Sequence, residues 1–327
     1  MTSTVTVANQ KAPAKRKKKP FSWPLFVQAL KANWVFWLVI TIGTSLIMII
    51  INVVIGGQKV AREIDMAEVN DYINAEGMNW LAILGLLYKL GFSLNKIQMM
   101  ATMDMTMILN QLIYNVAALL LPLVYVVVVG NRLIAAQVGS GSMAYIVSTP
   151  TTRGRIVRTE GLFFLLSLLA MYLLVGTAST VSEMLSYGDR AIPVRTIFLN
   201  LGLFVTVLGL GGVCFLGSCL FNRSRDSLAF GGGISIFSFI ANVLAIFGST
   251  TFVNLGVGVQ SMSFFSYISL VSLFDTTSID HFAKYLVGKD GGSFDLVWLY
   301  KLIGMLVISI VCFVVGHIVF KKKDLPL

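Results

Sequence analysis

Long stretches of this chain contain no charged residue, and this pattern more than any other restricts the folds open to it. A helix needs roughly 20 apolar residues to cross a membrane core about 30 Å thick, and its backbone must satisfy its own hydrogen bonds there. Only 12% of the residues are charged, whereas soluble domains carry about 25%. We therefore predict an all-α polytopic membrane protein with six transmembrane helices, at about residues 34–55, 105–130, 161–182, 196–220, 228–248 and 296–320.

The distribution of charge predicts which ends of these spans face the cytoplasm. Cytoplasmic loops of membrane proteins carry an excess of Lys and Arg. If both termini are cytoplasmic, 16 of the 25 Lys and Arg lie inside, and 12 of the 15 Asp and Glu lie outside. The net charge of +10 then follows from sidedness. We expect a multi-pass protein of the plasma membrane with cytoplasmic N- and C-termini.

The uncharged run at 227–274 is long enough for two crossings, so a seven-span chain has to be considered. A seventh crossing would place the basic residues at 321–323 outside, against the positive-inside rule. We therefore expect residues 249–274 to fold back as an extracellular re-entrant or interfacial hairpin. Gly248, Gly256 and Gly258 suit the turns that such a hairpin needs.

The N-terminal region divides into a basic tail at 1–20 and an aromatic segment at 21–33. A basic cluster can bind nucleic acid, but beside a membrane span it is expected to contact anionic lipid, so no nucleic-acid partner is predicted. The aromatic residues recur at helical spacing and predict an interfacial helix. It leads into the six-span domain at 34–327. No cleaved signal peptide is expected, because the first span is full length.

The residues that usually carry catalysis or bind metal are absent or scattered. There is no G-x-x-x-x-G-K-[ST] phosphate loop, so the chain does not hold ATP in that way. His281 and His317 are far apart in the sequence, and no hydrolytic triad is evident. Cys214, Cys219 and Cys312 lie in predicted spans and are expected to serve packing. We predict no enzyme activity, no metal and no cofactor for this chain by itself.

The inside loop between the second and third spans predicts a short helix. Glycines at 139 and 141 interrupt the inward extension of the second span, and Pro150 ends the segment that follows. On composition alone, an ordinary loop is an equal alternative. A helix this short is not stable by itself and is apolar enough to need a partner. Ser142 can cap this helix, and the residues expected to meet the partner are Met143, Tyr145 and Ile146.

A second helix is predicted to begin after this loop with Arg153, Arg155 and Arg158. These arginines are expected to contact either lipid headgroups or an acidic protein surface. Glu160 follows at the start of the third span, where we expect it to pair with Arg158 or to cap the helix.

Three segments together carry a resemblance to a known family. They read S-T-P-T-T-R-G-R-I-V at 148–157, C-L-F-N-R-S-R-D-S-L-A-F-G-G-G at 219–233 and F-K-K-K-D-L-P-L at 320–327. In this order and on this topology, the chain resembles the permease subunits of type-2 ABC exporters. The resemblance extends from the interfacial helix to the C-terminal tail. The outside stretch at 56–104 is longer than in many members of the family.

The resemblance implies partners and roles. Such a permease pairs with a second permease protomer, the same or paralogous, and binds two copies of a separate ATPase that holds ATP and Mg. Residues 142–149 would be the coupling helix, which docks on the ATPase together with the three arginines. The segment at 249–274 would cap the exit, and the second and fifth spans would line the path.

Those two spans contain polar residues at helical spacing. Gln111 and Asn115 are four apart in the second span, and Ser235, Ser238 and Asn242 form a similar stripe in the fifth. Polar groups at this depth face protein or water, so they either bond between helices or line a cargo path. Neither stripe carries a charge, which favours amphipathic cargo such as antimicrobial or cytolytic peptides, drugs or lipids.

Two other functions stay open at this stage. One is a permease-like peptide sensor or immunity protein, which would use ATPase coupling to release a captured peptide without transporting it. The other is a secondary carrier, which needs no ATPase. A carrier usually has acidic residues embedded in the membrane, and the predicted spans contain none.

Overall fold

The computed structural model describes residues 21–57, 112–148, 151–188, 191–249, 252–253, 258–289 and 291–323, and all regular structure within them is helical. Six runs of helix are long and apolar enough to cross a membrane. This confirms the prediction of an all-helical polytopic membrane protein. The six runs are α1 (Trp23–Gly57), η1 with α6 (Ile113–Ala117 and Ala118–Leu133), α9 (Arg153–Tyr187), α10 (Pro193–Leu220), α11 with η3 and α12 (Ser224–Ser227, Leu228–Gly232 and Gly233–Phe247), and α16 (Val297–Lys322).

The third span extends beyond its predicted bounds at both ends. The sequence predicts residues 161–182, but α9 begins at Arg153 and ends at Tyr187. The prediction stopped at Glu160 and Glu183, whereas the helix continues through both and buries their side chains. The basic tail at 1–20, most of the outside stretch at 56–104 and the start of the second span lie outside the described residues.

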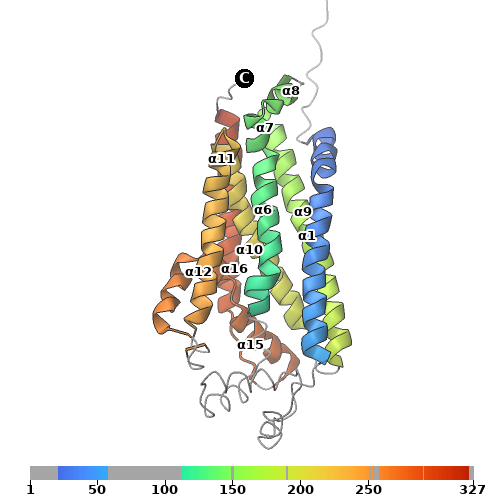
Figure 1. Cartoon of the computed structure of the whole chain (residues 1–327), viewed down its shortest axis with the longest axis vertical. Helices are drawn as coiled ribbons and strands as arrows, with labels where there is room; N and C mark the ends of the chain where they lie inside the picture. The colour runs from blue at the N-terminus through green and yellow to red at the C-terminus, as the bar shows by residue number, and fades with distance from the viewer. Residues whose placement is uncertain are drawn as a thin grey trace, which may run out of the picture.

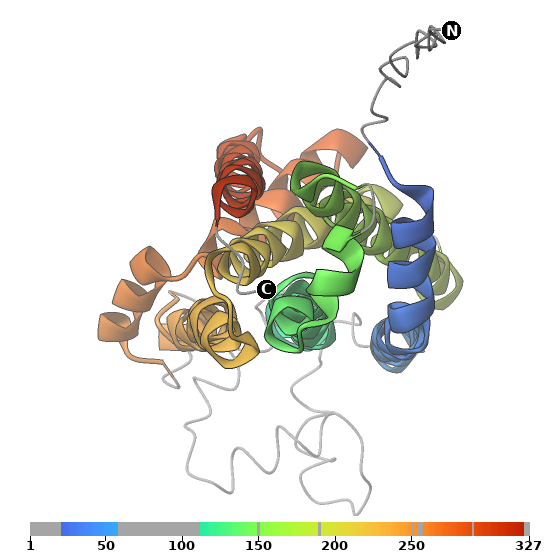
Figure 2. The same cartoon turned by 90° about the horizontal axis from the view of Figure 1, so that it is seen from above.

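Helix α10 is the centre of the bundle (Figure 2). In the apolar stretch of α10, 83% of the residues are buried, against 22% in the apolar stretches of α1 and α16. It packs against α6, α9 and α16, while α1 packs along α9. Gly212 allows the close approach of α10 and α16, because a Cβ there would lie only 3.3 Å from the Ser309 carbonyl oxygen. Small residues let membrane helices approach in this way.

A row of aromatic rings ties five of the spans together. Phe36, Tyr125, Phe164, Phe215 and Phe313 follow one another across α1, α6, α9, α10 and α16, with successive ring centroids 5.0 to 6.5 Å apart. Aromatic pairs at such distances stabilise beyond the area that they bury. The row therefore fixes how the spans pack against one another.

The first turns of α1 run across the end of the bundle before the helix turns along it (Figure 2). The sequence predicts a separate segment at 21–33, whereas the structure has one helix with a bend. The beginning of the chain's described part is held to α9, because the Ser22 N–H donates to Thr159 Oγ1 at 3.1 Å. Phe26 also packs edge-to-face on Phe163 of α9.

The chain runs back along α12 after that helix ends (Figure 1). The returning part contains η4 (Gln260–Phe264), α14 (Phe265–Ile268) and η5 (Val271–Leu273), all in contact with α12. Ser269 Oγ donates to the Ser238 carbonyl oxygen at 2.6 Å. Ser238 lies nine residues before the end of α12, so the chain has returned by about 13 Å along the helix axis.

One more helix, α15 (Thr276–Val287), closes the same end of the bundle (Figure 1). Asp275 caps its N-terminus by accepting a hydrogen bond from the Ser278 N–H, and Gly288 ends it in the left-handed conformation at φ 68°. Both are typical capping residues. This helix was not predicted, although Asp275 and Gly288 mark its two ends.

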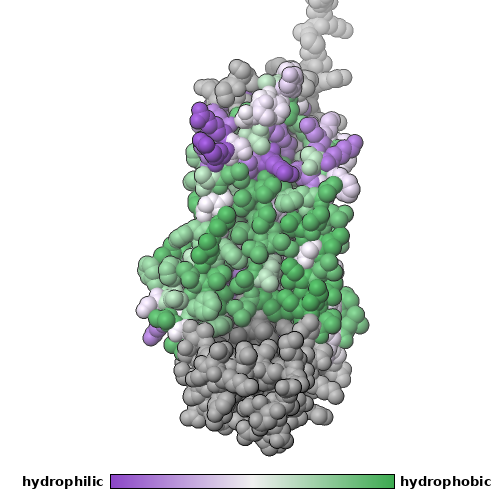
Figure 3. All heavy atoms as spheres, viewed as in Figure 1, coloured by the Kyte–Doolittle hydropathy of each residue, from purple (hydrophilic) through white to green (hydrophobic). Residues whose placement is uncertain are grey.

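The described surface has an apolar belt and a hydrophilic band beyond it, at the end where α7 (Ala135–Gly139), α8 (Ser142–Ser148) and α11 lie (Figures 1 and 3). The exposed basic residues of that end include Lys31, Arg132, Arg158, Arg223 and Arg225. We call this the basic end.

Candidate functional site

Helix α8 projects from the basic end, with one large side chain facing outward. Tyr145 is 80% exposed, while Met143 on the opposite side is only 2% exposed. Ile146 is half-buried and packs against the core. The structure thus has a helix beginning at Ser142, as the sequence predicts, and Thr149 lies outside the described residues. An exposed tyrosine on a helix with a buried anchor is suited to contact another protein.

The position of α8 is set by hydrogen bonds within the turn that precedes it. Gly141 has φ 74°, which favours glycine and allows the sharp turn between α7 and α8. Ser142 Oγ donates to the Gln137 carbonyl oxygen at 3.1 Å, so Ser142 ties α8 to α7.

Helix α7 and the end of α6 are in turn attached to the end of α10 and to α11. The Ala135 N–H donates to Ser218 Oγ at 2.8 Å, and Asn131 Nδ2 donates to Ser224 Oγ at 2.7 Å. A Cβ at Gly139 would lie 3.4 Å from the Asn222 carbonyl oxygen. A displacement of α8 would therefore act on both α6 and the start of the fifth span.

The three arginines at the start of α9 have different surroundings. Arg153 Nη1 donates to the Lys323 carbonyl oxygen at 2.6 Å, so it holds the end of α16. Arg158 is exposed. Arg155 is half-buried, and its Nε has no hydrogen-bond acceptor among the described residues. Glu160 is buried and pairs with no described arginine, so the expected pair with Arg158 is not formed.

The C-terminal end of α10 is held by Lys323, the residue that follows α16. Lys323 Nζ donates to the carbonyl oxygens of Cys219 and Leu220 at 3.1 and 2.7 Å. Burial lowers the pKa of this ammonium, and the nearby Cys219 opposes the shift. A cation at a helix C-terminus also stabilises the helix dipole, so Lys323 fixes the end of α10.

The polar stripe of the second and fifth spans is buried between helices of the chain. Asn242 Nδ2 donates to Asn115 Oδ1 at 3.4 Å, and Asn115 Nδ2 donates to Thr276 Oγ1 of α15 at 3.2 Å. Ser235 Oγ lies 3.4 Å from Cys214 Sγ, and Ser238 accepts from Ser269 through its carbonyl oxygen. The structure brings the two stripes together, whereas Gln111 lies outside the described residues.

A buried charged cluster at the opposite end was not predicted. Arg195 Nη2 lies 2.9 Å from Glu183 Oε1, and Arg195 Nη1 lies 3.4 Å from Asp280 Oδ1. Lys284 Nζ is 2.9 Å from Asp280 Oδ2. All three members of the central triad, Glu183, Asp280 and Arg195, are buried. The cluster joins the end of α9, the start of α10 and α15.

Further hydrogen bonds surround the carboxylate of Glu183. The Thr196 hydroxyl and the Ile192 N–H both donate to it. One turn earlier on α9, Ser179 Oγ accepts from Asn200 Nδ2 at 2.9 Å. Buried charges persist only when paired and hydrogen-bonded. Glu183, Asp280 and Arg195 are among the charges predicted to lie outside, and nothing in the sequence indicates that they meet.

A second ion pair fixes α15 to α16. Lys301 Nζ lies 2.6 Å from Asp275 Oδ2. Burial by itself raises the pKa of Asp275, but hydrogen bonds from Lys301 and the Ser278 N–H outweigh it and lower the pKa below its ordinary value of 3.8. The carboxylate is therefore stabilised in its charged form.

Stability supplied by Asp275 should be lost only in acid. Because its pKa is lower in the folded protein, the stabilisation is fully present above pH 3.8 and is lost as the pH falls through the folded-state value. Below pH 3.8, the unfolding temperature of the wild type should therefore fall more steeply with decreasing pH than that of Asp275→Asn. Asp226→Asn at the basic end is the control. If the unfolding temperature falls equally in acid for the wild type and for Asp275→Asn, this prediction is contradicted.

In the part of the chain that the structure describes, no group of three or more His, Cys, Asp or Glu side chains is placed to hold a metal ion. The cysteines at 214, 219 and 312 are free and buried. One end has a projecting helix, and the other has a helix held by buried ion pairs.

Comparison with models of protein families, with curated proteins and with solved structures finds no match to this chain. The fold and the site are therefore interpreted from their own geometry.

Proposed function

We propose that this protein is the permease subunit of a type-2 ABC exporter in the plasma membrane, with both termini cytoplasmic. It pairs with a second protomer and with a separate ATPase that binds ATP and Mg. The complex moves amphipathic molecules out of the cell, and the chain itself hydrolyses nothing. The observation that carries the proposal is α8, a short projecting helix with exposed Tyr145 on a buried Met143 anchor.

The basic end supports the orientation. The exposed Lys and Arg of that end lie around α8 and α11 (Figure 3), as expected for the cytoplasmic side. Arg158 is the exposed member of the three arginines on α9, and in this proposal it meets acidic residues of the ATPase. Arg153 supports the site by holding the end of α16.

The opposite end supports an extracellular cap. The part of 249–274 that the structure describes runs back along α12 and is tied to it at Ser238. In this proposal it is the re-entrant hairpin, and the bent start of α1 is the interfacial helix.

The coupling proposal predicts that Tyr145→Ala weakens ATPase binding. A single exposed tyrosine at the centre of an interface often dominates its energy, so retention of the ATPase should fall about fivefold or more. The full chain is co-expressed with a candidate ABC ATPase of the same genome, purified through the permease, and assayed for bound ATPase and ATP hydrolysis. Tyr267→Ala, which removes a tyrosine 87% exposed near the opposite end, is the matched control.

Equal retention in both variants would contradict the role of α8. A wild-type chain that purifies without any ATPase would overturn the exporter proposal as a whole. A secondary carrier or a sensor would then take its place, and the buried Glu160 on α9 would become the first residue to test for proton coupling.

The path proposal predicts that Asn242→Leu changes which cargo is exported. Asn242 and Asn115 bond each other at 3.4 Å in the described state, so they would meet cargo only when the second and fifth spans separate. Leucine has the same number of side-chain heavy atoms as asparagine and removes the polar group. We expect export of several fluorescent amphipathic cargoes from sealed vesicles to change in rank order, with the ATPase still bound.

Ser227→Ala, a buried serine at the basic end of the same helix run, is the control. Unchanged export of every cargo would count against a path along these residues. Binding of a toxic peptide without its transport would favour the sensor or immunity function.

A further inference from the structure

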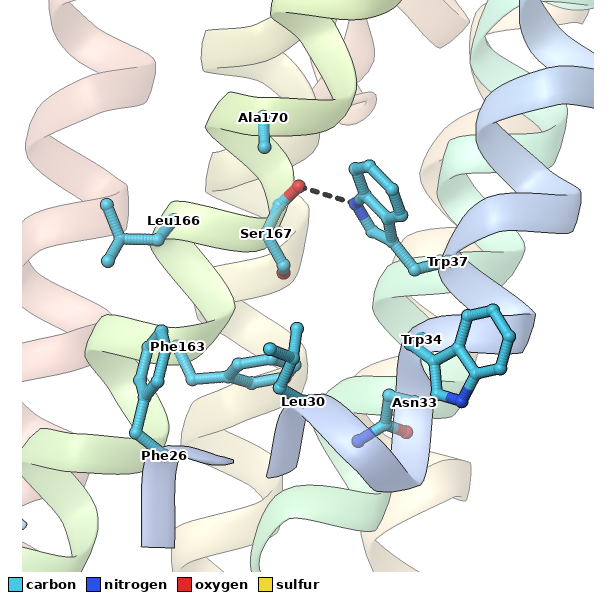
Figure 4. Close-up of a pocket in the computed structure, with 9 residues that line it drawn as sticks. All are labelled: Phe26, Leu30, Asn33, Trp34, Trp37, Phe163, Leu166, Ser167 and Ala170. Atoms are coloured by element: carbon cyan, nitrogen blue, oxygen red, sulfur yellow. Dashed lines mark hydrogen bonds between the residues drawn. The ribbon is translucent and has the colours of Figure 1, made fainter. Parts of the chain in front are cut away.

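A pocket lies between the bend of α1 and the middle of α9 (Figure 4). Its volume is about 240 Å³. The side chains in Figure 4 come from both helices, and Trp37 of α1 reaches Ser167 of α9. The residues that line it are Phe26, Leu30, Asn33, Trp34, Trp37, Phe163, Leu166, Ser167 and Ala170.

The lining is apolar except for one unused hydrogen-bond acceptor. Trp37 Nε1 already donates to the Ser167 carbonyl oxygen at 2.8 Å (Figure 4). Asn33 is only 4% exposed, and its Nδ2 donates to the Ala29 carbonyl oxygen. Its Oδ1 is buried and accepts no hydrogen bond from the described residues. This oxygen has almost no accessible surface, so the pocket itself offers an occupant mainly apolar contacts.

Two basic residues lie on the same two helices as this pocket, outside its lining. Lys31 is exposed next to Leu30 on the first part of α1. Arg155 lies on the same face of α9 as Phe163, two turns nearer the basic end. Its Nε has no acceptor among the described residues. Both residues lie toward the basic end of their helices.

We propose that this pocket binds an anionic phospholipid, such as phosphatidylglycerol, from the leaflet at the basic end. Part of one acyl chain fills the pocket, and the phosphate lies toward Lys31 and Arg155. Pockets for whole drug-sized ligands measure about 300–1,000 Å³, so 240 Å³ suits part of a chain better than a complete molecule. The site needs only a membrane and does not depend on the transport proposal.

The test uses the purified full chain in lipid nanodiscs with phosphatidylglycerol that carries a photoreactive diazirine on its acyl chain. Crosslinked peptides should come from residues 26–37 and 163–170. Ala170→Phe places a ring in the pocket and should lower this labelling at least fivefold. Leu173→Phe, on the lipid-facing side of the same helix, is the matched control and should label like the wild type. Excess unlabelled phosphatidylglycerol should compete in the wild-type protein, which tests the site without a substitution.

The headgroup part has its own readout. Matched diazirine phosphatidylcholine should label the wild type at least threefold less than phosphatidylglycerol. Lys31→Gln with Arg155→Gln should abolish this preference, whereas Arg225→Gln, elsewhere at the basic end, should keep it. Wild-type labelling in Ala170→Phe would overturn the pocket, and equal labelling by the two phospholipids would overturn the headgroup contact. A diazirine fatty acid that labels as strongly as phosphatidylglycerol would show that the pocket takes a free chain, which also overturns the proposal.

Discussion

Arg195→Met should lower the free energy of unfolding by about 3–5 kcal/mol, the usual cost of removing one partner from a buried ion pair. The guanidinium lies between Glu183 and Asp280 at 2.9 and 3.4 Å, and all three residues are buried. Methionine fills similar space but leaves Glu183 with no described cation beside it. The measurement is the temperature at which the purified protein loses its monodisperse state in detergent.

Two further variants separate charge loss from packing loss. Glu183→Gln in the Arg195→Met background should recover most of the stability, because Asp280 keeps Lys284 at 2.9 Å and no buried carboxylate is left unpaired. Lys301→Met breaks an ion pair whose side chains are 36% and 20% exposed, and solvent screening should limit its cost to about 1 kcal/mol or less. A double variant as unstable as Arg195→Met would mean that packing alone sets the loss.

Much of the fold follows from apolar runs in the sequence, because a membrane span needs length and hydrophobicity that few other structures need. The predicted first span at 34–55 falls inside α1, and the predicted last span at 296–320 nearly coincides with α16. The ends were less accurate, as with α9, because charge marks a polar boundary and does not end a helix. Breaks and caps mark helix ends better, as Gly288 does for α15.

The candidate site was predictable only where it is local in sequence. The short helix at α8 follows from two glycines before it and a proline after it. The charged cluster is not local, because Arg195 and Asp280 are 85 residues apart, and nothing in either segment indicates the other. The polar stripes were predictable in part. Helical spacing predicts each stripe, but only the packing of α12 shows that Asn242 meets Asn115 within one protomer.

Gly231→Ala and Gly233→Ala should have opposite effects on stability although they are two residues apart. A Cβ at Gly231 would lie 2.7 Å from the Cys214 Cα, a backbone atom of α10 that cannot move aside, whereas a Cβ at Gly233 would meet nothing within 4 Å. Overpacking of this kind costs about 1–3 kcal/mol. Replacing a glycine inside an open helix face gains up to about 1 kcal/mol in helix propensity.

Thermal unfolding should therefore occur at a lower temperature for Gly231→Ala than for the wild type, and at a higher one for Gly233→Ala. Gly231 lies in η3, where the fifth span crosses α10 beside the Cys214–Ser235 contact. A shift of the helix there would also move the stripe that contains Ser235 and Asn242. Gly231→Ala should therefore reduce transport by more than it reduces the amount of folded protein. Equal stability of the two alanine variants would mean that the fifth span can move away from α10 at little cost, and the close packing of these two helices could then not hold the stripe in place.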